Sequence, residues 1–290
     1  MSSKLPQHTE ITISAAHSKT MERGIGSSAM SLLRPMVSPR GRFITLKILG
    51  VLCLVGLWWI ASRILPEDIL PGPLPVVQTL AGNFRSGVLL VHFSDTMRRI
   101  VLGFFLALFG GIAFGTIMGL SQKMEAFLDT WVMVALTIPS LCFLVVIYIV
   151  FGLNEFSTVV AVAVSGFPSI TINVWQGVKN VDNKLLAMAR AFEISRSRRF
   201  FQIVMPQILP YIVAASRYGL GIVWKITVVA ELLGRNSGIG FQLHYWFQLF
   251  NMRQVFAWTL FFTLVMLFIE LAVFKQIELR LFHWRPATKF

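Results

Sequence analysis

Long apolar runs without charge alternate with short polar stretches along most of the chain. Because roughly 20 apolar residues in a helix cross the hydrocarbon layer of a membrane, these runs predict membrane-spanning helices. Three of the runs contain no charged residue, and the other three carry Lys, Arg or Glu within them or near their ends. The predicted spans are 43–65, 100–122, 130–154, 156–178, 206–233 and 255–276.

Composition agrees with this pattern, since 56% of the residues are hydrophobic, only 13% are charged and the mean hydropathy is +0.71. The expected fold class is an all-α integral membrane protein with six transmembrane helices in a lipid bilayer. We expect residues 1–42 to form a disordered cytosolic tail, 43–286 the transmembrane domain and 287–290 a cytosolic C-terminal end.

The net charge of +13 does not indicate nucleic acid, because so apolar a chain has no soluble face on which to display a basic footprint. The Lys and Arg residues are instead distributed unevenly between the two sides of the predicted spans. With the N-terminus inside, 18 of them fall on the cytosolic side and six outside. Cytosolic loops retain Lys and Arg, so this asymmetry predicts a multi-pass protein with both termini in the cytosol.

The second, third and fourth predicted spans contain small residues and prolines at notable positions. Pro139 and Pro168 lie inside the third and fourth spans, where each is expected to kink its helix, and broken helices are tolerated where they line a cavity. Both are therefore candidates for a translocation path. Five small residues at four-residue spacing predict a packing face on the second span, with pore lining as the alternative. They are Gly103, Ala107, Gly111, Gly115 and Gly119.

Lys225 and Glu231 lie within the fifth span, where a charged side chain must be paired or face a wet cavity. In one interpretation Lys225 pairs with Glu270 of the sixth span, or less favourably with Glu231. In the other it borders a translocation path and attracts an anionic solute. Glu231 is a second candidate for that path.

Nothing in the sequence supports catalysis by this chain. It has no phosphate-cradling glycine loop, metal-ligand pattern or nucleophile motif, so we expect no catalytic residue, no metal site and no bound cofactor. Energy for transport would come from a separate ATPase or from an ion gradient. An ion-coupled secondary transporter is therefore one alternative, and a membrane-embedded enzyme is another.

The cytosolic loop between the fourth and fifth spans is patterned. Residues 181–210 are expected to form two short helices, and Ser195 is expected to cap a second, basic helix that ends at Pro206. In the first helix an apolar stripe at helical spacing requires a partner. The stripe consists of Leu185, Leu186, Ala189 and Phe192.

This loop resembles the signature loop of binding-protein-dependent ABC importer permeases, whose pattern is Glu-Ala-Ala, three residues, Gly, nine residues, Ile-x-Leu-Pro. Ala189, Ile203 and Pro206 match the pattern at the right spacing. The family's Glu, Gly and Leu are replaced by Ala187, Glu193 and Met205.

Flanking segments over about residues 43–286 resemble the branch that transports nitrate, sulfonate, taurine and bicarbonate. The matching segments are Leu70-Pro71-Gly72-Pro73, Ile138-Pro139-Ser140, Phe151-Gly152-Leu153-Asn154-Glu155, Phe167-Pro168, Val181-Asp182, Arg217-Tyr218-Gly219-Leu220, Ala230-Glu231-Leu232-Leu233-Gly234 and Gly238-Ile239-Gly240.

The resemblance implies a type I importer permease in the inner membrane of a bacterial cell, importing a small, anionic solute by alternating access. Its partners would be ABC ATPase subunits that bind ATP and Mg, an extracytoplasmic solute-binding protein and a second permease copy, identical or paralogous. The loop would be the coupling helix that docks in a groove of the ATPase. The docking residues implied are Leu185, Leu186, Ala187, Met188, Ala189, Arg190, Phe192 and Glu193.

Glu193 replaces a glycine that can adopt positive φ freely, whereas other residues in that conformation lose on the order of 1 kcal/mol. Either the turn differs here, or a basic group of the partner offsets the strain, or the turn needs no positive φ.

Overall fold

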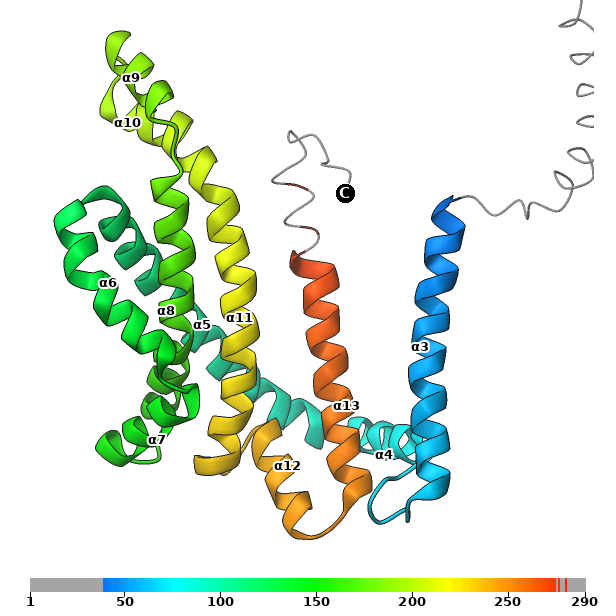
Figure 1. Cartoon of the computed structure of the whole chain (residues 1–290). Helices are drawn as coiled ribbons and strands as arrows, with labels where there is room; N and C mark the ends of the chain where they lie inside the picture. Colours follow the sequence, from blue (N-terminus) through cyan, green and yellow to red (C-terminus); the bar gives the residue numbers. More distant parts are fainter. Residues whose placement is uncertain (1–38, 275, 277–279, 281–290) are drawn as a thin grey trace, which may run out of the picture. The chain divides into compact units, whose positions relative to one another are not determined.

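The computed structural model describes residues 39–274, 276 and 280, and every regular element in this part of the chain is helical (Figure 1). Predictions for residues 1–38 and 287–290 lie outside the described residues. The elements are α3 (Pro39–Ile64), α4 (Pro73–Arg85), α5 (Val88–Leu120), α6 (Gln122–Thr137), α7 (Ser140–Phe151), α8 (Glu155–Lys179), α9 (Asn183–Ala191), α10 (Arg196–Arg199), α11 (Met205–Gly234), α12 (Ile239–Gln248) and α13 (Met252–Ile269), with π-helical segments η1 (Phe200–Val204) and η2 (Glu270–Phe274).

The boundary between two compact units falls within α3, after Trp58. In the first unit α3 carries only apolar residues between Lys47 and Trp58. A helix that is apolar on all sides suits lipid rather than water.

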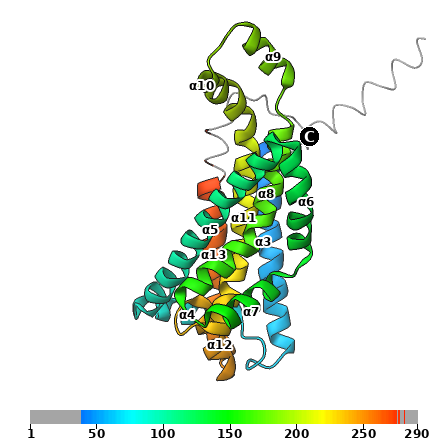
Figure 2. The same cartoon turned by 90° about the vertical axis from the view of Figure 1, so that its left-hand side faces the viewer.

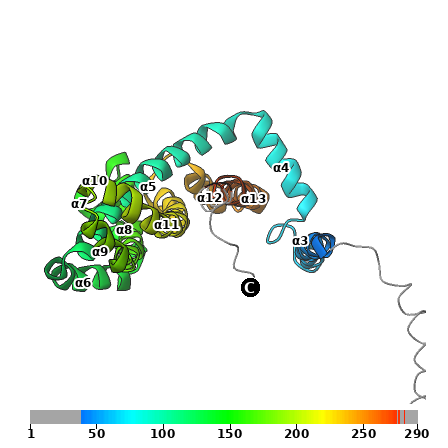
Figure 3. The ribbon, with the colours of Figure 1, turned by 90° about the horizontal axis from the view of Figure 1, so that it is seen from above.

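In the second unit α8 is the central helix, and it packs against both α5 and α11 (Figures 1 and 3). It is the most buried of the candidate spans in the described chain. Its N-terminus is fixed by a capping box, in which Asn154 and Ser157 each accept from the other's backbone N–H, at 2.8 and 3.1 Å. These bonds satisfy donors that a helix start would otherwise leave unpaired.

The small-residue face of α5 lies directly against α8. A Cβ added to Gly111 would lie 2.5 Å from a side-chain atom of Ile170, and one added to Gly115 would lie 2.6 Å from the carbonyl oxygen of Thr171. The two backbones therefore approach closely because no side chain separates them. The predicted packing face is confirmed, and these residues do not line a pore.

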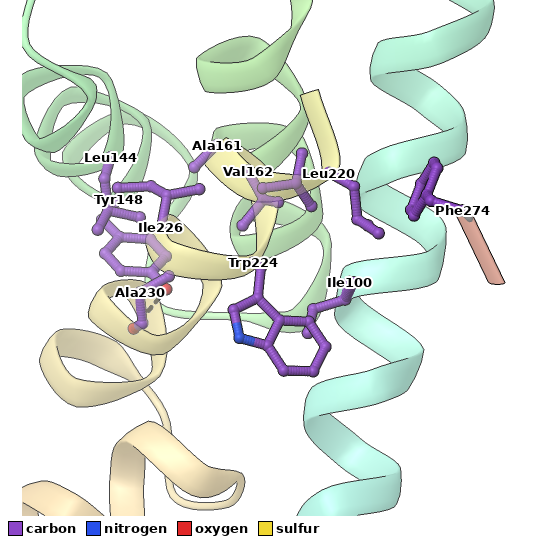
Figure 4. Close-up of a cluster of buried hydrophobic side chains, with 11 residues drawn as sticks. Ile100, Leu144, Tyr148, Ala161, Val162, Leu220, Trp224, Ile226, Ala230 and Phe274 are labelled. Atoms are coloured by element: carbon purple, nitrogen blue, oxygen red, sulfur yellow. Dashed lines mark hydrogen bonds between the residues drawn. The ribbon is translucent and has the colours of Figure 1, made fainter. Parts of the chain in front are cut away.

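A hydrophobic core joins α5, α7, α8 and α11 (Figure 4). Ile100 and Trp224 belong to this core, and the Trp224 ring stacks on Phe262 of α13 with centroids 4.4 Å apart. At its edge the Tyr148 hydroxyl donates to the carbonyl oxygen of Ala230 at 2.9 Å. Contacts of this kind hold the spans together where no water competes for the polar groups.

Pro139 breaks the third predicted span. α6 and α7 meet at this residue with a bend of 97°, which is far larger than a kink within one helix. The proline supplies no backbone N–H to continue the ladder, so α7 starts in a new direction.

Five helices of the described chain are long and apolar enough to cross a membrane, and the α6–α7 pair makes six if it counts as one broken span. The predicted all-helical membrane fold is confirmed. The second span begins earlier than expected, at Val88 rather than near residue 100. The sequence prediction left residues 88–99 out of this span because Arg98 and Arg99 are charged, but in the structure both arginines form ion pairs with glutamates.

The ends of the second unit differ. α9 and α10 project beyond α8 and α11 at one end, and α12 lies at the other (Figures 1 and 2). We call these the α9 end and the α12 end.

Candidate functional site

The helix α9 begins where the sequence predicts a short helix after the fourth span. The Asp182 side chain accepts from the backbone N–H of Lys184 at 2.7 Å and caps the first turn. A cap satisfies a donor that the helix itself cannot pair. Nine residues then carry the chain away from the bundle (Figure 2).

Only part of the predicted apolar stripe on α9 is exposed. Ala189 is 1% exposed, and Leu186 packs against a core that includes Val178 and Ile208. Ala189 anchors the helix to the bundle and is not available to a partner, so its assignment to the docking face is wrong, whereas Leu186 is half-buried against the same core. The exposed apolar residues are Leu185, Met188 and Phe192, of which Phe192 is 74% exposed.

The C-terminus of α9 closes in a complete Schellman turn. The N–H of Ile194 donates to the carbonyl of Ala189, and the N–H of Glu193 donates to that of Arg190, both at 3.0 Å. In this motif the residue after the C-cap takes a left-handed conformation, and Glu193 has φ 52°. The turn therefore keeps the geometry for which glycine is suited, at an expected strain on the order of 1 kcal/mol.

The second short helix differs from the prediction. Ser195 caps α10 as expected, with its hydroxyl accepting from the N–H of Arg198 at 3.5 Å. The helix does not end at Pro206, because η1 connects α10 to α11 without a break. The π-helical hydrogen-bond pattern of η1, just before Pro206, accommodates a residue that lacks a backbone N–H. Pro206 therefore lies within a continuous helical segment.

A cavity of about 530 Å³ lies between α11 and the end of α13 with η2. Most of its lining repeats every three or four residues and so forms one face of α11. The lining residues are Pro210, Val213, Ala214, Arg217, Tyr218, Gly221, Ile222, Lys225, Met266, Glu270 and Phe274.

Three charged side chains border this cavity. Arg217 forms an ion pair with Glu270. Lys225 is exposed to the cavity, and among the described residues no carboxylate lies within 4 Å of its ammonium group. The predicted pairing of Lys225 with Glu270 or Glu231 is therefore wrong, because both carboxylates have arginine partners.

The sequence did not reveal a buried charge cluster at the α12 end. Arg99 is completely buried, and its guanidinium donates to Glu155 at 2.6 Å and to Glu231 at 2.7 Å. Glu231 also accepts from the Thr96 hydroxyl and from the N–H of Gly240, each at 2.9 Å. Buried charges persist where they are paired and hydrogen-bonded, as these are.

The Arg99 cluster joins three spans, because its members belong to α5, α8 and α11. The guanidinium of Arg99 further donates to the carbonyl of Ser237 at 2.8 Å, which ties the loop before α12 to α5. One sequence signal was available: Arg99 and Glu155 border uncharged runs, where a charge requires a partner.

Residues 111–282 match the family model described as "Binding-protein-dependent transport system inner membrane component". This match covers more than half of the chain. The chain belongs to this family. Permeases of this family are transport subunits rather than enzymes, and they work with a separate ATPase and a substrate-binding protein.

Named relatives agree with the family assignment. The permease is 30% identical over 234 residues to a putative aliphatic sulfonates transport permease of Bacillus subtilis (strain 168), covering 80% of this chain and 84% of that protein. It is 30% identical to the taurine transport system permease of Escherichia coli (strain K12), over 71% and 77% of the two chains. A nitrate import permease of Synechococcus elongatus is 27% identical, over 66% and 73%.

The fold is also that of a solved importer. A chain of the MetNI methionine ABC transporter in an inward-facing conformation aligns with a TM-score of 0.57 at 16% identity, covering 64% of the permease and 93% of that chain. The type I importer permease fold is therefore confirmed.

Of the four residues expected on a translocation path, only Lys225 borders the α11–α13 cavity. Glu231 is completely buried beside Arg99, so its assignment to the path is wrong for this conformation. Pro168 is buried inside a continuous α8, and Pro139 is exposed at the α6–α7 break. Within the described residues no cluster of His, Cys, Asp or Glu could hold a metal ion.

Proposed function

We propose that this permease imports a small anion, with Lys225 as a fixed positive charge on the translocation path. The observation that carries the proposal is an ammonium group, unpaired within the described chain, on a membrane-spanning helix beside a cavity of about 530 Å³. A charge in this setting needs a counter-charge or water. A carboxylate, sulfonate or nitrate passing the cavity would supply the counter-charge.

The names of the relatives support the same solute class, since they refer to aliphatic sulfonates, taurine and nitrate. A positive side chain lowers the energy of an anion in a low-dielectric setting, where water provides little solvation. The Arg217–Glu270 pair beside it contributes little net charge, so the cavity retains the charge of Lys225.

The α9 end faces the cytosol in this proposal, with both termini on the same side of the bacterial inner membrane. ATPase subunits carrying ATP and Mg dock on the exposed face of α9, and their closure is transmitted through α9 to α8 and α11. The docking face consists of Leu185, Ala187, Met188, Arg190, Phe192 and Glu193. A second permease, identical or paralogous, completes the path, and a binding protein delivers the solute at the α12 end.

Uptake by proteoliposomes that contain the assembled transporter tests the function. With binding protein outside and ATP inside, we expect uptake of a radiolabelled sulfonate, taurine or nitrate, whereas an ion gradient without ATP should give none. Uptake driven by the gradient alone would contradict the ATP-driven mechanism.

Substitutions of Lys225 test its role. Lys225→Met should preserve the protein level but reduce uptake at least tenfold, and Lys225→Arg, the matched control, should retain most of it. Full uptake by the Lys225→Met transporter would exclude the proposed charge.

A further inference from the structure

Glu193 is exposed in the turn that follows α9. Four arginines lie within six residues of it, at positions 190, 196, 198 and 199. Even so, in the described part of the chain no cation lies within 4 Å of the Glu193 carboxylate. The Glu193 carboxylate is therefore unpaired within the described chain, although four basic residues are close to it in the sequence.

The backbone of this turn fixes the point from which the Glu193 side chain starts. Glu193 has φ 52°, and both hydrogen bonds of the Schellman turn hold it there. This conformation fixes the direction in which the Cβ of Glu193 leaves the backbone, directly after the exposed Phe192.

Glu193 is also the odd charge on an otherwise basic surface. The exposed residues of the loop include Lys184, Arg190, Arg196 and Arg198, whereas Asp182 uses its carboxylate to cap α9. A groove that complements the charge of this loop would be largely acidic. One carboxylate in that setting is repelled unless the groove places a cation opposite it.

We infer that Glu193 is a specificity-determining residue for the ATPase, and that the cognate ATPase presents an arginine or lysine at the point that receives the α9 turn. This inference rests on the proposed docking of α9. An ion pair at the tip fixes the register of the helix in its groove, and an ATPase with an apolar or acidic group at that point is rejected. Glu193 can thus form an ion pair that selects the partner, which a glycine at the same position could not.

Two substitutions with similar backbone preference isolate the charge. Asp and Asn both tolerate positive φ better than Glu does, and they differ by one charge. We would measure the affinity of the ATPase that co-purifies with the permease, added back to purified permease in lipid nanodiscs. Glu193→Asp should bind within about threefold of the natural permease, whereas Glu193→Asn should bind about tenfold more weakly, as expected for loss of a charge-assisted hydrogen bond. Glu193→Gly should also bind about tenfold more weakly, although it relieves the strained backbone.

Equal affinities of the Glu193→Asp and Glu193→Asn permeases would overturn the inference, and so would tighter binding by Glu193→Gly. Phe192→Asp separates this failure from failure of the docking proposal. If Phe192→Asp abolishes binding while Asp and Asn at position 193 behave alike, only the role of Glu193 is wrong. If Phe192→Asp also binds normally, α9 is not the docking helix and both proposals fail.

Discussion

Glu193 and Phe250 occupy equivalent positions in two Schellman turns at opposite ends of the bundle. Each directly follows the C-cap of a short helix, and their φ angles are 52° and 54°. Phe250 follows α12, where the N–H of Asn251 donates to the carbonyl of Trp246 at 3.0 Å. They are the only residues other than glycine with positive φ in the described chain.

Both turns are predicted to be strained by their side chains. Glycine at either position relieves this strain of about 1 kcal/mol, and after allowance for its greater freedom in the unfolded chain the net gain should be at most about 0.5 kcal/mol. Thermal denaturation in detergent should show higher melting temperatures for Phe250→Gly and for Glu193→Gly. A lower melting temperature for Phe250→Gly would mean that its exposed ring has a contact that the described chain does not show.

The orientation of the permease can be checked by chemical labelling. In a background with Cys53→Ala and Cys142→Ala, Lys184→Cys at the α9 end should react only when reagent reaches the cytosol, and Asn251→Cys at the α12 end should react from outside. The reason is the concentration of Lys and Arg on the α9 side. Labelling of both positions from the same side would refute the topology.

How much of the fold follows from sequence depends on how local the signal is. The apolar runs predict the spans because each run contains its own evidence, and Asp182 marks the start of α9 by a bond two residues away. The start of α5 does not follow, since Arg99 is stabilised by Glu155 and Glu231, which lie 56 and 132 residues further along the chain. When the sequence does not show the partner of a charged residue, that residue is interpreted as the end of a membrane span.

The docking face shows a second limit. Helical spacing places Leu185, Leu186, Ala189 and Phe192 on one broad stripe, but it does not show which edge of that stripe meets the bundle. The answer depends on Val178 and Ile208, which α8 and α11 bring beneath the helix. Likewise, only the tertiary structure shows that Glu270 pairs with Arg217 and leaves Lys225 to the cavity.

Aspartate substitutions at Phe192 and at Ala189 should affect different properties of the permease. Phe192→Asp alters an exposed residue, so the permease should remain folded but lose the ATPase, because a buried phenylalanine contributes about 1.5–3 kcal/mol. Ala189→Asp introduces a charge at a buried position and should reduce the amount of folded permease instead. Gel filtration and co-purification measure the two effects separately, and unchanged co-purification with Phe192→Asp would refute the docking face.

The close approach of α5 and α8 predicts a sharp contrast between two glycines. The Cβ of Gly111→Ala would lie 2.5 Å from Ile170, so we expect a loss of about 1–3 kcal/mol in the stability of the permease. Gly221→Ala, in the middle of α11, meets no atom within 4 Å and should be neutral or gain about 0.5–1 kcal/mol. Equal stability of the two variants in a denaturation series would show that α5 and α8 can separate without loss.

Neighbouring arginines on α5 provide the last contrast. Arg99→Met leaves the completely buried Glu231 without its cation, and an uncompensated buried charge destabilises a protein by about 3–5 kcal/mol. Arg98→Met, the control, removes a side chain that is 59% exposed and lies 3.5 Å from Glu155, so the expected loss is at most about 0.5 kcal/mol.

Because Arg99 acts through Glu231, its loss should be partly reversible. Glu231→Gln removes the unpaired charge while its side-chain oxygen still accepts from Thr96 or Gly240, so the double variant Arg99→Met, Glu231→Gln should recover part of the stability. Denaturation of the four purified permeases in detergent gives the coupling free energy directly. If the double variant is as unstable as the sum of the two single variants, Arg99 and Glu231 are not coupled, and the cluster does not hold α5, α8 and α11 together by their ion pair.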